Sequence, residues 1–415
     1  MPVLRPAGLK RRPGHVCILH FEFAVKDRVL IVGLSTRAAA ESAARAGFDV
    51  TALDAYADLD QHPSVRALSL PRDFNVHPTA PAGARAARTI ESDAVAYLSS
   101  FENHPRAVTM LAAGRTLWGN PAEVLRRVRD PVVVSDTMRR CGFDVPRVRL
   151  AASAGDADDG EAWMVKPFRS GGGQRVGPWK RRPVPRTAYL QEFIAGIPGS
   201  VVFATARGHT VPLGVSRQLA GDPAFGARGY RYCGSLLAAA DDPQFPGGRA
   251  LVDRACALAR RVGGQFGLAG VNGVDFIARD GSPYPIEVNP RWSASMELVE
   301  TLFGLSVFGV HADACGRGEL PSFDFGEASR HVGAIGKAVV FARHAIVVGD
   351  TSAWLGDATV RDVPRPGERI DAGQPVCTVF ATAPDAGRCY LALVRRSARL
   401  YEELADWTAV RRATA

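Results

Sequence analysis

Lysine is scarce in this chain. Only five of its 51 Lys and Arg residues are lysine, namely Lys10, Lys26, Lys166, Lys180 and Lys337. The other cations are arginines dispersed along 415 residues with a formal net charge of +9, and no dense basic run with interleaved aromatic residues occurs. Dispersed arginines are typical of a solvated protein face rather than of a nucleic-acid groove. We therefore expect no nucleic-acid partner, and the few lysines become candidates for specific roles.

Spacings typical of structural metal and disulfide sites are also missing. The seven cysteines include no CxxC pair and the nine histidines form no HExxH motif, which favours reduced thiols over a disulfide framework. No apolar run approaches the ~18–20 residues of a membrane span. The short apolar patch at residues 16–25 contains His20 and Glu22 and makes a poor signal peptide. These absences predict a cytoplasmic protein without a membrane partner.

Length and composition predict a globular protein of two or three domains. The chain has 47% apolar and 22% charged residues, which excludes wholesale disorder and collagen-like repeats. Residues 28–54 read as strand, helix and strand, typical of a parallel α/β unit. The turn after Gly33 lacks the second and third glycines of a dinucleotide-binding motif. The hypothesis of a Rossmann-type oxidoreductase is therefore supported only by this one strand–helix–strand unit.

A glycine-rich segment gives the strongest local pattern. Lys166 lies in a short apolar strand, and Gly171, Gly172 and Gly173 follow it without interruption. Consecutive glycines permit positive φ and a close backbone approach, and their N–H groups can surround phosphate oxygens. Because the lysine precedes the glycines, this is not a Walker A loop. Taken alone, the segment could equally be a flexible hairpin tip.

A second pattern places acidic and amide side chains together. Glu287 and Asn289 alternate along one expected strand and so share a face, which Asp275 on the preceding antiparallel strand can reach. Two carboxylates and an amide oxygen are hard ligands of the kind that hold Mg²⁺ while substrate phosphates complete the octahedron. Arg291 lies two residues further on the same face and could contact a transferred phosphoryl group. The alternative is a surface hairpin with scattered acids.

A third segment, Tyr189–Ile194, reads as a strand between these two patterns. Together, in this order and spacing, the three segments resemble the ATP-grasp superfamily of ligases. The resemblance covers residues 109–312. It implies an α/β and α+β fold with an extension at 1–27, a small parallel α/β (pre-ATP-grasp) domain at 28–108 and a β-rich C-terminal unit at 313–415. The sequence after Arg291 is most similar to a branch of predicted carboligases, some of which accompany genes for methanopterin- and methanofuran-type one-carbon cofactors.

The resemblance assigns a role to each matching residue. Lys166 and Gly171–Gly173 would bind the phosphates of ATP, and Arg291 would stabilise charge on the transferred phosphoryl group. The metal, Mg²⁺ or Mn²⁺, would be held by Asp275, Glu287 and Asn289. The adenine would be lined by Gln191, Glu192, Phe193 and Ile194. The chain departs from the family pattern where a second phosphate-contacting lysine is common, since Arg129 stands there, and it lacks an acidic ribose ligand after the hinge strand.

These roles predict an ATP-dependent ligase that joins a small-molecule carboxylate to an amine, or to a thiol, through an acyl phosphate. Dimers are common in the superfamily, so a homodimer is one candidate state. The alternative is a non-catalytic ATP-binding regulatory protein. The sequence does not identify the substrates. We expect them to bind near Phe101–His104, near Ser293–Glu297 and near residues 218–248, a segment that is predicted to be a mobile loop. Lys337 is a weaker candidate for the same cleft.

Overall fold

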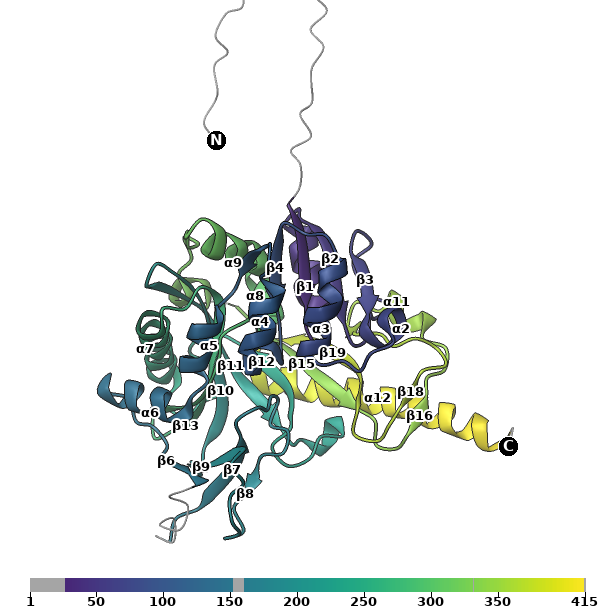
Figure 1. Cartoon of the computed structure of the whole chain (residues 1–415). Helices are drawn as coiled ribbons and strands as arrows, with labels where there is room; N and C mark the ends of the chain where they lie inside the picture. The colour runs from purple at the N-terminus through teal and green to yellow at the C-terminus, as the bar shows by residue number, and fades with distance from the viewer. Residues whose placement is uncertain (1–26, 152–159, 331, 414–415) are drawn as a thin grey trace, which may run out of the picture.

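The computed structural model describes residues 27–151, 160–330 and 332–413. The apolar patch at residues 16–25 and nearly all of the predicted extension at 1–27 lie outside the described residues. The described chain contains a parallel sheet, a long antiparallel sheet, a small four-stranded sheet and a two-stranded sheet (Figure 1).

The N-terminal part is a parallel sheet with helices on both faces, as predicted. Alternate residues of its central strand point to opposite sides, so that Val29 and Ile31 pack with helix α1 while Leu30 and Val32 pack with α3 and α4. In spatial order the strands are β3 (Arg66–Ser69), β2 (Asp49–Asp54), β1 (Arg28–Val32), β4 (Ala94–Tyr97) and β5 (Thr116–Trp118). The helices of this region are α1 (Arg37–Arg45), α2 (Leu70–Phe74), α3 (Ala80–Ala86), α4 (Pro105–Leu111), α5 (Ala122–Val128) and α6 (Pro131–Arg140).

The long sheet has eight strands and is antiparallel throughout. Helix α7 (Gly248–Phe266) covers one face, where Leu251, Leu258 and Val262 are fully buried. In spatial order the strands are β14 (Ser282–Asn289), β13 (Gly270–Arg279), β10 (Ile197–Ala206), β11 (His209–Ala220), β12 (Tyr232–Leu237), β15 (Ala334–Phe341), β19 (Pro375–Ala383) and β17 (Val360–Arg361). The last three strands come from the C-terminal region, so the sheet runs across the predicted boundary at residue 312.

A small sheet forms a separate lobe at the lower end of the molecule in Figure 1. Its strands, in spatial order, are β6 (Val148–Leu150), β9 (Ala188–Glu192), β7 (Trp163–Pro167) and β8 (Gly177–Pro178). Trp163 and Leu190 form its buried centre. The glycine-rich segment links β7 to β8, and this position places it at the edge of the lobe.

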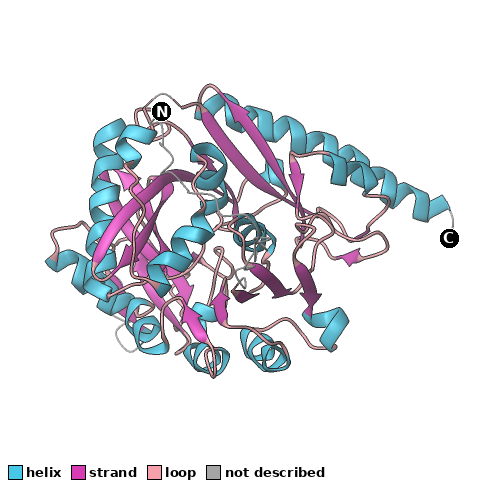
Figure 2. Cartoon of the chain, turned by 90° about the horizontal axis from the view of Figure 1, so that it is seen from above, coloured by secondary structure: helices cyan, strands magenta, loops and turns pink. Residues whose placement is uncertain are grey.

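The C-terminal helix α12 (Ala386–Ala413) lies along one side of the molecule in Figure 2. Near the start of this helix, Cys389 and Leu393 are fully buried in the cluster that packs it against the long sheet. The remaining elements are short: β16 (Ile346–Val347), β18 (Arg369–Ile370), α8 (Met296–Phe303), α9 (Val307–Gly316), α10 (Phe325–Ala328) and α11 (Ser352–Gly356).

Residues 218–248 do not form the predicted mobile loop. Strand β12 of this segment lies inside the long sheet, where Cys233 and Leu236 are fully buried. Gly234 in this strand allows the backbone of β15 to approach closely, since a Cβ there would lie 2.3 Å from the carbonyl oxygen of Lys337.

Among the described residues, no single helix is long and apolar enough to cross a membrane. The bent pair of α8 and α9 meets the criteria of length and composition only when the two helices are taken together.

Candidate active site

The acidic hairpin forms as the sequence predicts. Asp275 of β13 pairs directly with Glu287 of β14, and Gly273 pairs with Asn289. The Asn289 amide donates to Oδ2 of Asp275 at 3.0 Å, and the Gln218 amide donates to Oδ1 at 2.9 Å. The two carboxylates and the Asn289 amide therefore lie together at the edge of the long sheet.

The two carboxylates of the hairpin have different electrostatic environments. Burial and the neighbouring carboxylate of Glu287 raise the pKa of Asp275 to about 6. Burial also acts to raise the pKa of Glu287, but the nearby cations Arg129 and Lys166 outweigh it, and the pKa is lowered. Among the described residues Asp275 forms no ion pair, and the more distant Arg291 lowers its pKa less than burial and Glu287 raise it.

This donor set fits a divalent cation. Two carboxylates and one amide oxygen are ligands that suit Mg²⁺, which usually keeps several non-protein oxygens. The described residues hold no group of three or more His, Cys, Asp or Glu side chains that could bind a metal ion by themselves. Asp275, Glu287 and Asn289 would therefore hold Mg²⁺ only together with oxygens from a bound phosphate.

Lys166 connects the small lobe to the hairpin. Its ammonium lies 3.0 Å from Oε1 of Gln191 on β9 and 3.1 Å from the carbonyl oxygen of Ile286 on β14. The side chain is buried at the end of β7, in a cavity that Arg129 and Glu287 also line. A cation in this position can contact phosphates held beside the acidic hairpin.

The four predicted adenine-lining residues do not share one environment. Gln191 lines the cavity, and its amide nitrogen lies 3.4 Å from the Ile286 carbonyl oxygen. Glu192 instead accepts hydrogen bonds from the backbone and the guanidinium of Arg147. Phe193 is 41% exposed and Ile194 is buried, and neither lines the cavity.

The glycine-rich segment between β7 and β8 forms a loop at residues 170–173, the glycine loop, which contacts two other segments of the chain. The carbonyl oxygen of Ser170 accepts from the Asn103 amide at 3.3 Å, and that of Gly172 accepts from the Tyr232 N–H at 3.0 Å. Gly173 has a φ of 71° and packs so closely that a Cβ would lie 1.8 Å from the carbonyl oxygen of Tyr230. Nothing lies within 4 Å of a Cβ placed on Gly171 or Gly172. Only Gly173 is therefore required by close packing.

The sequence did not reveal the partners of two arginines. Nη1 of Arg129 lies 2.6 Å from Oε1 of Glu287. Nη2 of Arg291 lies 2.7 Å from Oε1 of Glu102 and 3.3 Å from Oδ1 of Asn289. Glu102 belongs to the short helix η2 (Phe101–Asn103), which follows strand β4. Glu102 therefore brings this polar segment into contact with Arg291, a pairing that could be found only in the fold.

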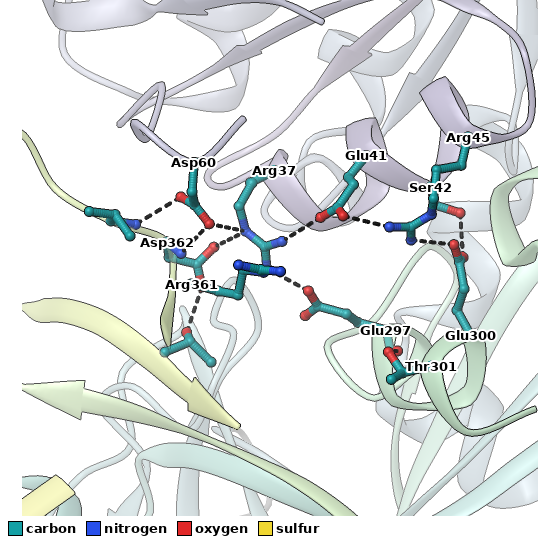
Figure 3. A network of polar contacts seen from close by, with 12 residues as sticks. Arg37, Glu41, Ser42, Arg45, Asp60, Glu297, Glu300, Thr301, Arg361 and Asp362 are labelled. Atoms are coloured by element: carbon teal, nitrogen blue, oxygen red, sulfur yellow. Dashed lines mark hydrogen bonds and ion pairs between the residues drawn. The ribbon is translucent and has the colours of Figure 1, made fainter. Parts of the chain in front are cut away.

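A second group of charged side chains is centred on Arg37 (Figure 3). The guanidinium of Arg37 is fully buried and contacts Glu297 at 2.5 Å, Asp362 at 2.7 Å, Glu41 at 3.0 Å and Asp60 at 3.5 Å. These partners belong to the N-terminal region, to helix α8 and to the segment after β17, so Arg37 joins three parts of the chain.

Lys337, the weaker candidate, belongs to the same network. Its ammonium lies 2.7 Å from Oε2 of Glu297. Burial acts to raise the pKa of Glu297, but Arg37 and Lys337 together lower it to about 2. Both oxygens of Glu297 are therefore engaged by cations, which gives Lys337 a role in joining β15 to helix α8.

Comparison with known proteins identifies the fold. A family model described as the ATP-grasp domain matches residues 129–295, a segment that contains Lys166, the glycine loop and the acidic hairpin. The uncharacterized protein MJ0776 of Methanocaldococcus jannaschii is 24% identical over 117 residues, which are 28% of this chain and 27% of that relative. The matched segment is thus about a quarter of the relative's length.

Solved structures share the fold over most of the chain. Pyruvate carboxylase of Rhizobium etli superposes with a TM-score of 0.68 and 15% identity over 89% of this chain, although this is only 37% of that larger chain. The biotin carboxylase domain dimer of the Hydrogenobacter thermophilus 2-oxoglutarate carboxylase, solved with Mg·ADP, ADP and bicarbonate, gives 0.66 and 13%, with 86% of both chains covered. The L-amino acid ligase of Bacillus licheniformis gives 0.64 and 16%, covering 92% of this chain and 98% of that one.

Proposed function

This chain carries an ATP-grasp domain within an ATP-grasp fold, and from this premise we propose that it is an ATP-dependent ligase joining a carboxylate to an amine through an acyl phosphate. The observation that carries the proposal is the convergence of Lys166, Arg129 and Arg291 on the hairpin of Asp275, Glu287 and Asn289. Three cations beside two carboxylates and an amide suit a metal-bound polyphosphate.

ATP would occupy the cavity between the small lobe and the hairpin. The phosphates of ATP would contact Lys166 and the glycine loop, and its adenine ring would lie toward Gln191 on strand β9. When bound, Mg²⁺ supplies charge neutralisation and orientation of the phosphate oxygens. Arg129 would exchange its contact with Glu287 for a phosphate oxygen, serving as the second phosphate-binding cation.

Arg291 would act where the γ-phosphate meets the substrate carboxylate. Its guanidinium lies between Asn289 and Glu102, at the junction of the hairpin and the N-terminal region. There it can orient the substrate carboxylate and stabilise charge on the transferred phosphoryl group. Transfer to the carboxylate oxygen gives an acyl phosphate and ADP, and attack by an amine then releases phosphate.

The proposal is tested by trapping the acyl phosphate with hydroxylamine. Purified protein is incubated with Mg·ATP, hydroxylamine and a panel of carboxylates that includes amino acids, dicarboxylic acids and pterin and furan precursors. We expect one carboxylate to give a hydroxamate together with an equal amount of ADP. Glu287→Gln should abolish both products while its thermal unfolding stays cooperative. Tight ATP binding without ADP or hydroxamate for any carboxylate would contradict the proposal and favour a non-catalytic ATP-binding protein.

A further inference from the structure

One carboxylate at the site has an oxygen without a hydrogen-bond partner among the residues that the structure describes. Glu102 is 1% exposed, and its Oε2 is buried without a hydrogen-bond partner. A buried carboxylate oxygen that gives up water and gains no donor costs free energy, on the order of 1–3 kcal/mol. Such a cost at the candidate active site calls for a functional reason.

The geometry of the Arg291 contact leaves this oxygen free. Both Nε and Nη2 of Arg291 lie closest to Oε1 of Glu102, at 3.0 and 2.7 Å. An arginine can satisfy both oxygens of a carboxylate with two parallel bonds, but here one oxygen takes both contacts. Arg291 therefore fixes the carboxylate through Oε1 and leaves Oε2 without a donor.

Glu102 is also in the right place for the second substrate. It is separated from Asn289 only by the guanidinium of Arg291, the group expected to lie beside the acyl phosphate. It follows β4, at the carboxyl end of the parallel sheet, where α/β sheets commonly bind ligands. Its electrostatic neighbours on the surrounding elements are Tyr97, His104 and Arg129, besides Arg291.

The other carboxylates around the site are already engaged. Asp275 and Glu287 belong to the expected metal site, and both oxygens of Glu297 contact Arg37 and Lys337. Among the residues that the structure describes around the hairpin, Glu102 thus has the carboxylate oxygen that a substrate cation can use.

We propose that Glu102 binds the ammonium group of the amine substrate at Oε2 and removes its proton. The ammonium has no lone pair, so it must transfer a proton to Oε2 before the nitrogen can attack. The neutral amine then forms a C–N bond to the acyl carbon, the bond from that carbon to the phosphate oxygen breaks, and phosphate leaves with its electron pair. The nitrogen gives its second proton to the departing phosphate, which leaves a neutral amide. The second substrate is accordingly a primary amine that enters as a cation. This assignment rests on the proposed ligase function.

Hydroxylamine separates this role from a structural one, because it is largely uncharged at neutral pH and needs no base. In Glu102→Gln, amide formation with a panel of alkylamines and amino acids should fall about 10²–10⁴-fold, the usual contribution of a general base. Hydroxamate formation with the same carboxylate should change less than about 3-fold, since its nucleophile needs no proton removal. In Glu102→Ala, formate should restore amide formation. Glu123→Gln, a matched change at an exposed carboxylate on α5, should alter neither rate.

Three results would overturn the assignment. Equal loss of amide and hydroxamate in Glu102→Gln would indicate a structural role through Arg291. Selective loss of amide formation in His104→Gln, with Glu102→Gln unaffected, would move the base to His104. Absence of hydroxamate from the wild-type protein with every carboxylate would remove the ligase function and this assignment with it, and it differs from the other two results because the wild type itself fails.

Discussion

Nη1 of Arg129 lies 2.6 Å from Oε1 of Glu287, although the two residues are 158 positions apart in the sequence. The guanidinium also donates to the Val288 carbonyl oxygen and, through Nη2, to Oδ1 of Asn103. Arg129 therefore neutralises one carboxylate of the expected metal site and joins the hairpin to the N-terminal region. These contacts of Arg129 hold the hairpin in place, and we expect a bound metal and phosphate to draw the guanidinium away from Glu287.

Arg129→Gln should destabilise the protein and make its stability depend on magnesium. Removing one partner of a largely buried pair costs about 3 kcal/mol, because Glu287 then faces Asp275 with only the weaker influence of Lys166 and Arg291 to offset the repulsion. Added MgCl₂ should therefore raise the melting temperature of the variant more than that of the wild type. Arg126→Gln, at an exposed position on α5, is the control and should change the free energy of unfolding by less than ~0.5 kcal/mol. Equal stability of Arg129→Gln and wild type would contradict the pairing.

The three loop glycines should differ in their tolerance of alanine. Gly171 has open space for a Cβ and no positive φ, so Gly171→Ala should leave kcat/KM for ATP within about 3-fold, the scale of a sub-kcal/mol effect. Gly172 has open space but a φ of 59°, and a cost of ~1 kcal/mol predicts a loss of about 5-fold. Gly173→Ala meets the backbone of Tyr230 and should lose more than ~10-fold. Steady-state kinetics over varied ATP checks the order, and equal effects at Gly171 and Gly173 would refute it.

Two arginines on helix α1 provide a matched pair for the buried network. Arg37→Gln should lower the free energy of unfolding by about 3–5 kcal/mol, since it removes a fully buried cation that Glu297, Asp60 and Asp362 share. The side chain of Arg45 is 48% exposed, and Arg45→Gln should cost about 0–1 kcal/mol despite its contacts with two glutamates. Urea unfolding of both variants measures the difference. Similar losses from the two substitutions would show that Arg37 does not organise the network.

His311 should make stability depend on pH. Its Nδ1 accepts from the Val271 N–H at 3.0 Å and its Nε2 lies 3.2 Å from the Trp118 carbonyl oxygen, a pairing that fits the neutral ring. Burial lowers its pKa from 6.5 to about 4. As the pH falls from 6.5 to 4, the unfolded chain binds a proton that the folded chain does not, so stability present above pH 6.5 is lost.

Between pH 6.5 and 4, the free energy of unfolding should fall by about 3 kcal/mol because of His311. His311→Gln keeps a donor and an acceptor but does not titrate, so the difference in unfolding free energy between wild type and variant should shrink on acidification. Chemical denaturation at pH 7, 5.5 and 4.5 provides the comparison. A difference that stays constant with pH would place the proton-linked loss elsewhere.

Patterns of local spacing predicted the parts of the site that lie within one strand or hairpin. Glu287 and Asn289 alternate on a single strand, and a hairpin of ordinary length brings Asp275 opposite. Lys166 and the glycine loop are likewise adjacent in sequence. Strand β12 was missed because Gly234 and Ser235, which look like turn residues, serve the close packing of strands in the middle of a sheet.

Contacts between distant segments were beyond sequence reasoning. Arg291 and Glu102 are 189 residues apart, and Arg37 and Asp362 are 325 apart. No periodicity encodes such pairs, because they depend on how the N-terminal sheet docks against the long sheet. The scarcity of lysine drew attention to Lys166 and Lys337, and both are buried in the structure, Lys166 beside the amide oxygen of Gln191 and Lys337 in an ion pair with Glu297.

Transfer of oxygen from the carboxylate to phosphate tests the central claim most directly. The carboxylate that supports hydroxamate formation is labelled with ¹⁸O in both oxygens and incubated with the protein, Mg·ATP and an amine. An acyl-phosphate route places one ¹⁸O atom in each molecule of phosphate released, because the phosphoryl group departs with the carboxylate oxygen it received. Phosphate that carries no ¹⁸O while ADP accumulates would contradict the account.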